Sequence, residues 1–203
     1  DGGWSRRTVA STGSLNHGLE FTSTSNINGN EGDLDDDHYL YASSATTVFR
    51  WKLNITTLTP NDPEIVIVNM NADGQGGAPF GHRTRTLAYD ASKSRLYVSV
   101  GSGGNVDPNS FRSRIRRFDI STANLNAVDV LPMDFETGFV FADGLRNEVG
   151  LALDRHGVLW GVENSADSLF RSDLGGRELT ETNPAEELNR FPEATAGSHY
   201  GYP

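Results

Sequence analysis

The sequence predicts an all-β fold for the 203-residue chain, and two observations carry that prediction. Residues alternate with period two over short runs such as Thr47–Trp51, Ile115–Asp119 and Ser168–Ser172, which is the period of a β-strand and not of a helix. The 22 glycines agree with a chain that turns often. No apolar stretch with helical period is long enough for a core helix, and the one helical candidate is Pro184–Asn189, with Asn183 as N-cap.

A repeat refines this prediction to a β-propeller. His17, His82 and Asn147 are each separated by 65 positions, and each comes at the start of an expected first strand. The other expected strands are Tyr39–Ser43, Thr47–Trp51 and Glu64–Val68; then Arg95–Gly101, Ile115–Asp119 and Ala127–Leu131; then Val158–Val162 and Ser168–Ser172. Four short antiparallel strands per repeat are typical of a propeller blade. We therefore predict one partial propeller domain, 1–203, with blades at about 10–75, 76–142 and 143–190.

Three blades are too few to close a ring, because propellers have about 4–8 blades. Open ends would leave sheet faces and edges exposed. Either the chain is a piece of a longer protein, or a second copy or another chain completes the ring.

Composition narrows the function classes. The formal net charge of −10 argues against nucleic acid as a partner. The chain has no cysteine and no apolar stretch long enough to cross a membrane. No signal peptide is evident, and we expect Asp1 to be a processed or truncated end. Asn54-Ile55-Thr56 is an N-glycosylation sequon, a weak indication of secretion.

Three residues at the repeat positions suit catalysis or ligand binding. His82 follows the glycine-rich run 74–81, and an imidazole can act as a general base near neutral pH. Arg146 and Asn147 could together bind carboxylates and carbonyls of a planar ligand. The alternatives stay open: His82 as a structural histidine, and Arg146-Asn147 as an ion pair between blades with a capped turn.

Three further segments have weaker signals. The run Glu163–Asp167 could present backbone carbonyls to a hard cation, or be a plain polar turn. The acidic run Asn26–Asp37 has the composition of a calcium loop without its glycine register, so a solvated hairpin is favoured. The cluster Arg112, Arg114, Arg116 and Arg117 is interpreted as pairing with the acidic excess.

Five separated motifs resemble the soluble quinoprotein glucose/sorbosone dehydrogenases, in the branch of the fungal pyrroloquinoline-quinone-dependent pyranose dehydrogenases. They are 16–21 (NHGLEF), 81–85 (GHRTR), 144–148 (GLRNE), 163–167 (ENSAD) and 197–203 (GSHYGYP), in the family's order. The resemblance implies a six-bladed propeller about twice this length, with its site near the axis. It implies that His82 is the general base, that Arg146 and Asn147 contact the cofactor, and that backbone carbonyls of Ser165 and Ala166 bind calcium.

The leading hypothesis is therefore a secreted enzyme that oxidises a pyranose at C1, with pyrroloquinoline quinone (PQQ), calcium and an external electron acceptor. One departure is the length, because the missing blades would supply further basic residues around the cofactor. Another is Ser165, which stands where many relatives have glycine. The rival hypothesis is a non-catalytic, carbohydrate-binding half-propeller that pairs with itself, and a third is a segment without a separate function.

Overall fold

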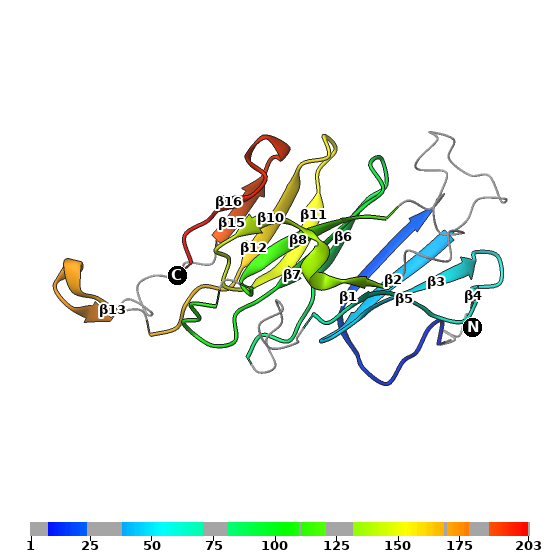
Figure 1. Cartoon of the computed structure of the whole chain (residues 1–203), viewed down its shortest axis with the longest axis horizontal. Helices are drawn as coiled ribbons and strands as arrows, with labels where there is room; N and C mark the ends of the chain where they lie inside the picture. Colours follow the sequence, from blue (N-terminus) through cyan, green and yellow to red (C-terminus); the bar gives the residue numbers. More distant parts are fainter. Residues whose placement is uncertain are drawn as a thin grey trace, which may run out of the picture.

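The computed structural model describes residues 8–23, 38–70, 81–109, 111–120, 132–168, 170–178 and 187–202. Three sheets lie side by side in chain order, and a fourth, two-stranded hairpin projects away from them (Figure 1). The expected acidic insert, most of the glycine-rich run before His82 and the strand expected at Ala127–Leu131 lie outside the described residues.

The first sheet corresponds to the first expected blade. Its main strands follow the order β1-β2-β3-β5, all antiparallel, and a short strand from much later in the chain joins β5 in parallel. The strands are β1 (Leu15–Ser23), β2 (His38–Ser44), β3 (Val48–Asn54), β4 (Thr59–Pro60), β5 (Glu64–Val68) and the late-coming β9 (Met133–Asp134). The strands expected at 39–43, 47–51 and 64–68 are confirmed.

The second sheet repeats this plan, and the described part of the third has three of its antiparallel strands. The second comprises β6 (Leu87–Asp90), β7 (Arg95–Val100), β8 (Arg114–Asp119) and β10 (Phe139–Asp143), with β16 (Ser198–His199) parallel to β10. The third comprises β11 (Glu148–Leu153), β12 (Leu159–Glu163) and β15 (Glu187–Phe191). The all-β prediction and the partial propeller are confirmed.

Two secondary-structure predictions for the third blade are wrong. Ser168–Ser172 was expected to be its third strand, but β13 (Phe170–Arg171) pairs only with β14 (Arg177–Glu178) in the projecting hairpin. The true third strand is β15, so Glu187–Asn189, expected in a helix, are extended. Pairing with β12 along five positions outweighs the weak helical preference of this polar run.

The first strand of each blade is the inner strand, and the inner strands are joined by buried hydrogen bonds. Ser43 Oγ accepts from Gly18 N at 2.9 Å and donates to Arg85 O at 2.7 Å, which links the first blade to the second. Thr86 Oγ1 and Ser99 Oγ both donate to Glu148 O, at 3.2 and 2.8 Å, which links the second to the third. The first strands therefore converge, as the repeat predicts.

Apolar side chains fill the two interfaces between blades. Between the first and second blades, Tyr41 stacks on Tyr89 at 5.5 Å between ring centroids. Between the second and third, Tyr97 meets Phe141 edge-on at 4.9 Å, within a cluster that includes Leu159 and Phe191. Burial between neighbours is what holds the blades at a fixed angle.

The two end faces of the described blades remain open. Leu19 on β1 is 65% exposed and Leu188 on β15 is 69% exposed, values unusual for leucine in a sheet. A groove of about 590 Å³ runs along the first blade between Leu15, Leu19, Phe21 and the segment Thr8–Ala10. These faces have the character of blade interfaces without a neighbour.

The described helical residues form single 3-10 turns: η2 (Phe135–Thr137), η3 (Ser172–Leu174) and η4 (Glu193–Thr195). Within the described part of the chain, no helix has the length and apolarity that crossing a bilayer requires.

Candidate functional site

The predicted site residues lie on loops at one edge of the second and third blades. Adjacent strands run antiparallel, so the start of β6, the end of β7, the end of β10, the start of β11 and the end of β12 share that edge. The loops at 81–86, 101–105, 144–147 and 164–167 are thereby brought together, although they are spread over more than eighty positions of sequence.

His82 is half-buried and held through one ring nitrogen. Its Nδ1 lies 2.9 Å from Ser102 Oγ and 3.1 Å from Ser102 O, while His82 N donates to Ser102 O at 3.2 Å. Ser102 Oγ itself donates to Gly104 O at 2.6 Å, so it accepts from the imidazole. Nδ1 therefore bears the proton, and Nε2 keeps its lone pair.

The surroundings of His82 favour its neutral form. Burial lowers the pKa of His82 below its usual value, and the nearby positive charge of Arg146 lowers it further. Carbonyl contact with Ser102 acts in the opposite direction without reversing the shift. A neutral imidazole with a lone pair on Nε2 is the form that a general base needs.

Arg146 is only 5% exposed, and its side chain forms hydrogen bonds with the loop after β7 and with the loop after β12. Its Nε and Nη2 donate to Asn105 O and Oδ1 at 3.1 and 3.0 Å, and Nη1 donates to Asn164 O at 3.2 Å. Nη2 also pairs with Asp167 Oδ2 at 3.3 Å, an ion pair within the third blade and not the ion pair between blades of the alternative interpretation. Its charge faces His82 while its donors fix the loop shapes.

Asn147 and His82 meet over Gly101. A Cβ at Gly101 would come within 2.5 Å of Asn147 Oδ1 and 2.7 Å of His82 Cβ, so only glycine allows both side chains to approach this point. Asn147 is 4% exposed, and its carbonyl oxygen accepts from Asn164 N at 3.0 Å. That bond fixes the backbone of Asn147, and close packing at Gly101 places its amide beside His82.

Ser165 and Ala166 are half-buried on the loop after β12 that Arg146 braces through Asn164 and Asp167. Among the described residues, no group of three or more His, Cys, Asp or Glu side chains could hold a metal ion. A hard cation here would therefore depend on backbone carbonyls and on ligands from outside the described residues.

The first histidine of the repeat has a different environment. His17 lies inside β1, not before it, and its Nε2 is 3.0 Å from Val149 O on β11. The neighbouring Asn16 Nδ2 donates to Arg83 O at 3.0 Å. This end of the inner strand therefore contacts both other blades.

Below the loops lies a buried carboxyl pair that sequence reasoning missed. Glu148 and Glu163 face each other across β11 and β12, and Asn189 Nδ2 donates to Glu148 Oε1 at 2.8 Å and to Glu163 Oε2 at 3.2 Å. Burial raises the pKa of Glu148 to about 8 and that of Glu163 to about 7. Glu163 Oε1 also accepts from Arg146 N, which connects the pair to the site. The sequence feature that could have predicted this pair is a glutamate at the start of one expected strand, Glu148, and another at the end of the next, Glu163.

The arginine cluster forms mainly ion pairs, as expected. Arg112 pairs with Asp107 at 3.2 Å, Arg114 with Asp143 at 3.1 Å, and Arg117 with Glu193 at 2.6 Å. Arg116 instead donates to the carbonyl oxygens of Glu136 and Gly138.

Comparison with known proteins decides the family. The family model described as TrAA12-like matches residues 3–203. The chain belongs to the TrAA12-like family. The resemblance drawn from the five motifs is thereby confirmed.

Two curated relatives are similar to this TrAA12-like chain. A pyrroloquinoline quinone-dependent sugar dehydrogenase of Hypocrea jecorina is 35% identical over 210 residues, which cover 97% of this chain and 43% of the relative. A pyrroloquinoline quinone-dependent pyranose dehydrogenase of Coprinopsis cinerea is 33% identical over 176 residues, covering 81% and 22%. The chain spans less than half the length of either relative.

Solved structures show the same fold. A calcium structure of the Trichoderma reesei enzyme of Carbohydrate-Active Enzymes Family AA12 superposes with a TM-score of 0.77 at 33% identity, covering 97% of this chain and 46% of that one. The holo form of the pyranose dehydrogenase PQQ domain from Coprinopsis cinerea gives 0.77 at 26% identity, covering 98% and 46%. The TrAA12-like chain is part of a propeller.

Proposed function

We propose that this chain forms the site-bearing part of a PQQ- and calcium-dependent enzyme that oxidises a pyranose sugar at C1. The observation that carries the proposal is the state of His82: Nδ1 is held by Ser102, Nε2 keeps a lone pair, and burial with the charge of Arg146 favours the neutral ring. The curated relatives, which are PQQ-dependent sugar and pyranose dehydrogenases, support the cofactor and the substrate class.

His82 would take the proton of the C1 hydroxyl at Nε2 as the C1–H bond breaks. The hydrogen of C1 departs with its two electrons, so C1 becomes a carbonyl carbon and the sugar a lactone. PQQ, when bound, would supply the hydride acceptor, calcium would supply Lewis-acid assistance, and an external electron acceptor would complete the redox balance. His82 then returns its proton to water.

The residues around Gly101 fit a planar, anionic cofactor. Arg146 provides buried positive charge, Asn147 provides an amide that can donate and accept, and the absence of a Cβ at Gly101 lets Asn147 and His82 lie side by side against the backbone. Ser165 and Ala166 would offer backbone oxygens to calcium, whose preferred ligands are oxygens. These residues would be part of a cage completed by other blades.

The test is dye reduction by the purified protein with calcium, PQQ and a panel of pyranoses, assayed as this chain and as a full propeller that contains it. We expect activity from the full propeller that falls about 10²–10⁴-fold in His82→Ala. No activity from the full propeller, or an undiminished rate in His82→Ala, would overturn the proposal.

A second candidate function rests on the open end faces. Exposed Leu19 and Leu188 could pair two copies, or this chain with the remainder of a propeller, into a closed ring without catalysis. This candidate predicts sugar binding without dye reduction, which the same assay distinguishes.

Secretion is part of the proposal and rests on one local feature. The sequon residue Asn54 ends β3 and is exposed, as are Ile55 and Thr56, so an oligosaccharide transferase could reach it. Asn54 Oδ1 accepts from Thr57 N at 2.9 Å, which leaves the amide nitrogen outward for a glycan. Intact mass before and after glycosidase treatment of natively produced protein tests this.

A further inference from the structure

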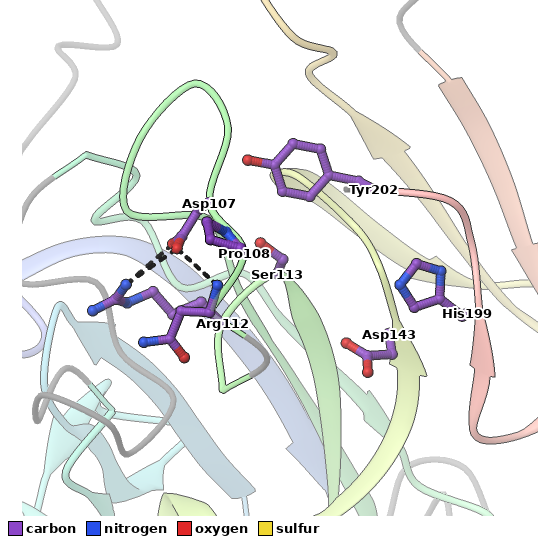
Figure 2. Close-up of a pocket in the computed structure, with 8 residues that line it drawn as sticks. Asp107, Pro108, Arg112, Ser113, Asp143, His199 and Tyr202 are labelled. Atoms are coloured by element: carbon purple, nitrogen blue, oxygen red, sulfur yellow. Dashed lines mark hydrogen bonds and ion pairs between the residues drawn. The ribbon is translucent and has the colours of Figure 1, made fainter.

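A polar pocket lies against the segments 107–109 and 112–113, and His82 is not among its lining residues. It has a volume of about 160 Å³ and is bounded by Asp107, Arg112 and Ser113 on those segments, and by Asp143, His199 and Tyr202 (Figure 2). A cavity of about 150 Å³ accommodates one six-membered carbon ring, so this pocket has room for a ligand of that size.

Ser113 is the unusual residue of the pocket. Its side chain is 3% exposed, and its Oγ has no hydrogen-bond partner within the described structure. Its backbone has a φ of 60°, the left-handed region that serine seldom adopts, and is held there by Leu145 N donating to Ser113 O at 2.8 Å. A strained serine in the wall of a cavity, with a buried hydroxyl that lacks a partner, indicates a ligand contact.

The charges at the pocket are already neutralised. Asp107 pairs with Arg112 at 3.2 Å and also accepts from Gly103 N, and Asp143 pairs with Arg114 through both carboxylate oxygens at 3.1 and 3.2 Å. A bound anion would face two carboxylates, and a bound cation would face the guanidinium group of Arg112. A neutral ligand whose hydroxyls bridge the ion pairs avoids both costs.

The rings of His199 and Tyr202 form the remaining part of the pocket wall. Gly201 N donates to His199 Nδ1 at 3.1 Å, so His199 Nε2 carries a hydrogen and is a donor. The hydroxyl of Tyr202 donates to Asn105 O at 3.1 Å, and Tyr202 N donates to Gly144 O at 2.9 Å, which fixes the tyrosine ring beside the cavity. An apolar ring face next to carboxylates and a hydroxyl suits a molecule with apolar CH faces and polar edges.

We infer that this pocket binds the ring of a neutral polyhydroxylated ligand, a pyranose or a polyol of that size, at a site separate from the one at His82. Ser113 Oγ is a contact, Asp143 accepts from ligand hydroxyls, and Tyr202 packs on the ring. The inference is tested independently of catalysis at His82, because His82 is not among the residues that line this pocket.

The probe is methyl α-D-glucopyranoside, which has no free C1 hydroxyl and so is no substrate for oxidation at C1. Titration of the isotope-labelled chain, followed through backbone amide NMR signals, should show saturable shifts at Gly144 and Gly201. Ser113→Gly should weaken binding about fivefold, the loss expected for one neutral hydrogen bond. It should also preserve or raise the melting temperature, since glycine tolerates the positive φ.

The matched control is Ser94→Gly. Ser94 also has a positive φ, of 52°, but lies in the turn between β6 and β7, so the same backbone relief should leave glucoside binding unchanged. His82→Ala should likewise leave it unchanged. Absence of saturable shifts up to about 50 mM glucoside, equal binding by Ser113→Gly, or tighter binding of inorganic phosphate or calcium at the same signals would each overturn the inference.

Discussion

His82 Nδ1 lies 2.9 Å from the hydroxyl oxygen of Ser102, a residue twenty positions later in the chain. The hydroxyl donates a hydrogen bond to Gly104 O at 2.6 Å, so a short chain of hydrogen bonds runs from the imidazole into the loop after β7. This chain fixes both the tautomer and the orientation of the ring.

We expect Ser102→Ala to lower the rate of dye reduction about two- to tenfold, since the carbonyl of Ser102 still accepts from Nδ1 while the hydroxyl contact is lost. The measurement is kcat with saturating sugar beside His82→Ala, whose loss should be far larger. Equal losses in the two variants would show that Ser102 does more than orient the ring.

Arg146 should control the pH dependence. Because its charge lowers the pKa of His82, Arg146→Met should move the acidic limb of kcat/KM to higher pH, toward the usual histidine value. Arg146→Lys keeps the charge and should leave the limb near its original position, although lost loop contacts reduce the rate in both variants. A limb that does not differ between Met and Lys would contradict the electrostatic explanation.

Gly101→Ala should disrupt the site without unfolding the blade. The added methyl would collide with Asn147 Oδ1 and His82 Cβ, so we expect activity to fall by at least about tenfold, in line with a misplacement of reacting groups. Gly104→Ala is the control, because a Cβ there meets nothing within 4 Å. Circular dichroism should show the same strand content in both variants.

Glu148 should make stability depend on pH. Its folded pKa of about 8 exceeds the usual 4.5, so the folded state holds a proton that the unfolded state releases, and stability falls as pH rises from 4.5 to about 8. Glu148→Gln should flatten this decline, which can reach about 1.4 kcal/mol per pH unit for one group. Urea unfolding at pH 5 and pH 8 measures the difference in the free energy of unfolding. The control is Glu136→Gln at an exposed position, which should leave that difference unchanged.

The open end faces should make the isolated chain associate. We expect a mass above 22.1 kDa by light scattering at micromolar concentration, and a return to that mass in the double variant Leu19→Glu with Leu188→Glu. Val106→Glu changes an equally exposed apolar residue on a loop away from both faces and should not alter the mass. A monomeric unaltered chain would rule out self-pairing.

The alternation of apolar and polar residues predicts the strands of the first two blades well, because one side of each strand packs against a neighbouring blade. It fails for β15, where Asn189 points inward to bind Glu148 and Glu163. A polar residue at a buried position removes the apolar period on which the prediction depends, and the run then resembles a polar helix.

The repeat and the five motifs predict that His82, Arg146 and Asn147 belong to one site, and they lie on one loop cluster. Ser102, Gly101 and Asn105 could not be predicted. Their roles follow from the antiparallel pairing of β6 with β7 and from loop shapes after β7, and neither leaves a local pattern in the sequence.

The parallel pairing of β5 with β9 has a consequence for synthesis of the chain. The outermost antiparallel strand of the first sheet is β5, which ends at Val68. The strand that pairs with its free edge is β9, Met133–Asp134, and Asn69 Nδ2 also donates to Asp134 Oδ2 at 2.6 Å. At ribosomal rates the interval between the synthesis of β5 and that of β9 lasts roughly 3–13 s, during which the edge stands bare. The same holds for β10 until β16 emerges. The outer strands of the first two blades are therefore completed only after much of the following blade has been synthesised.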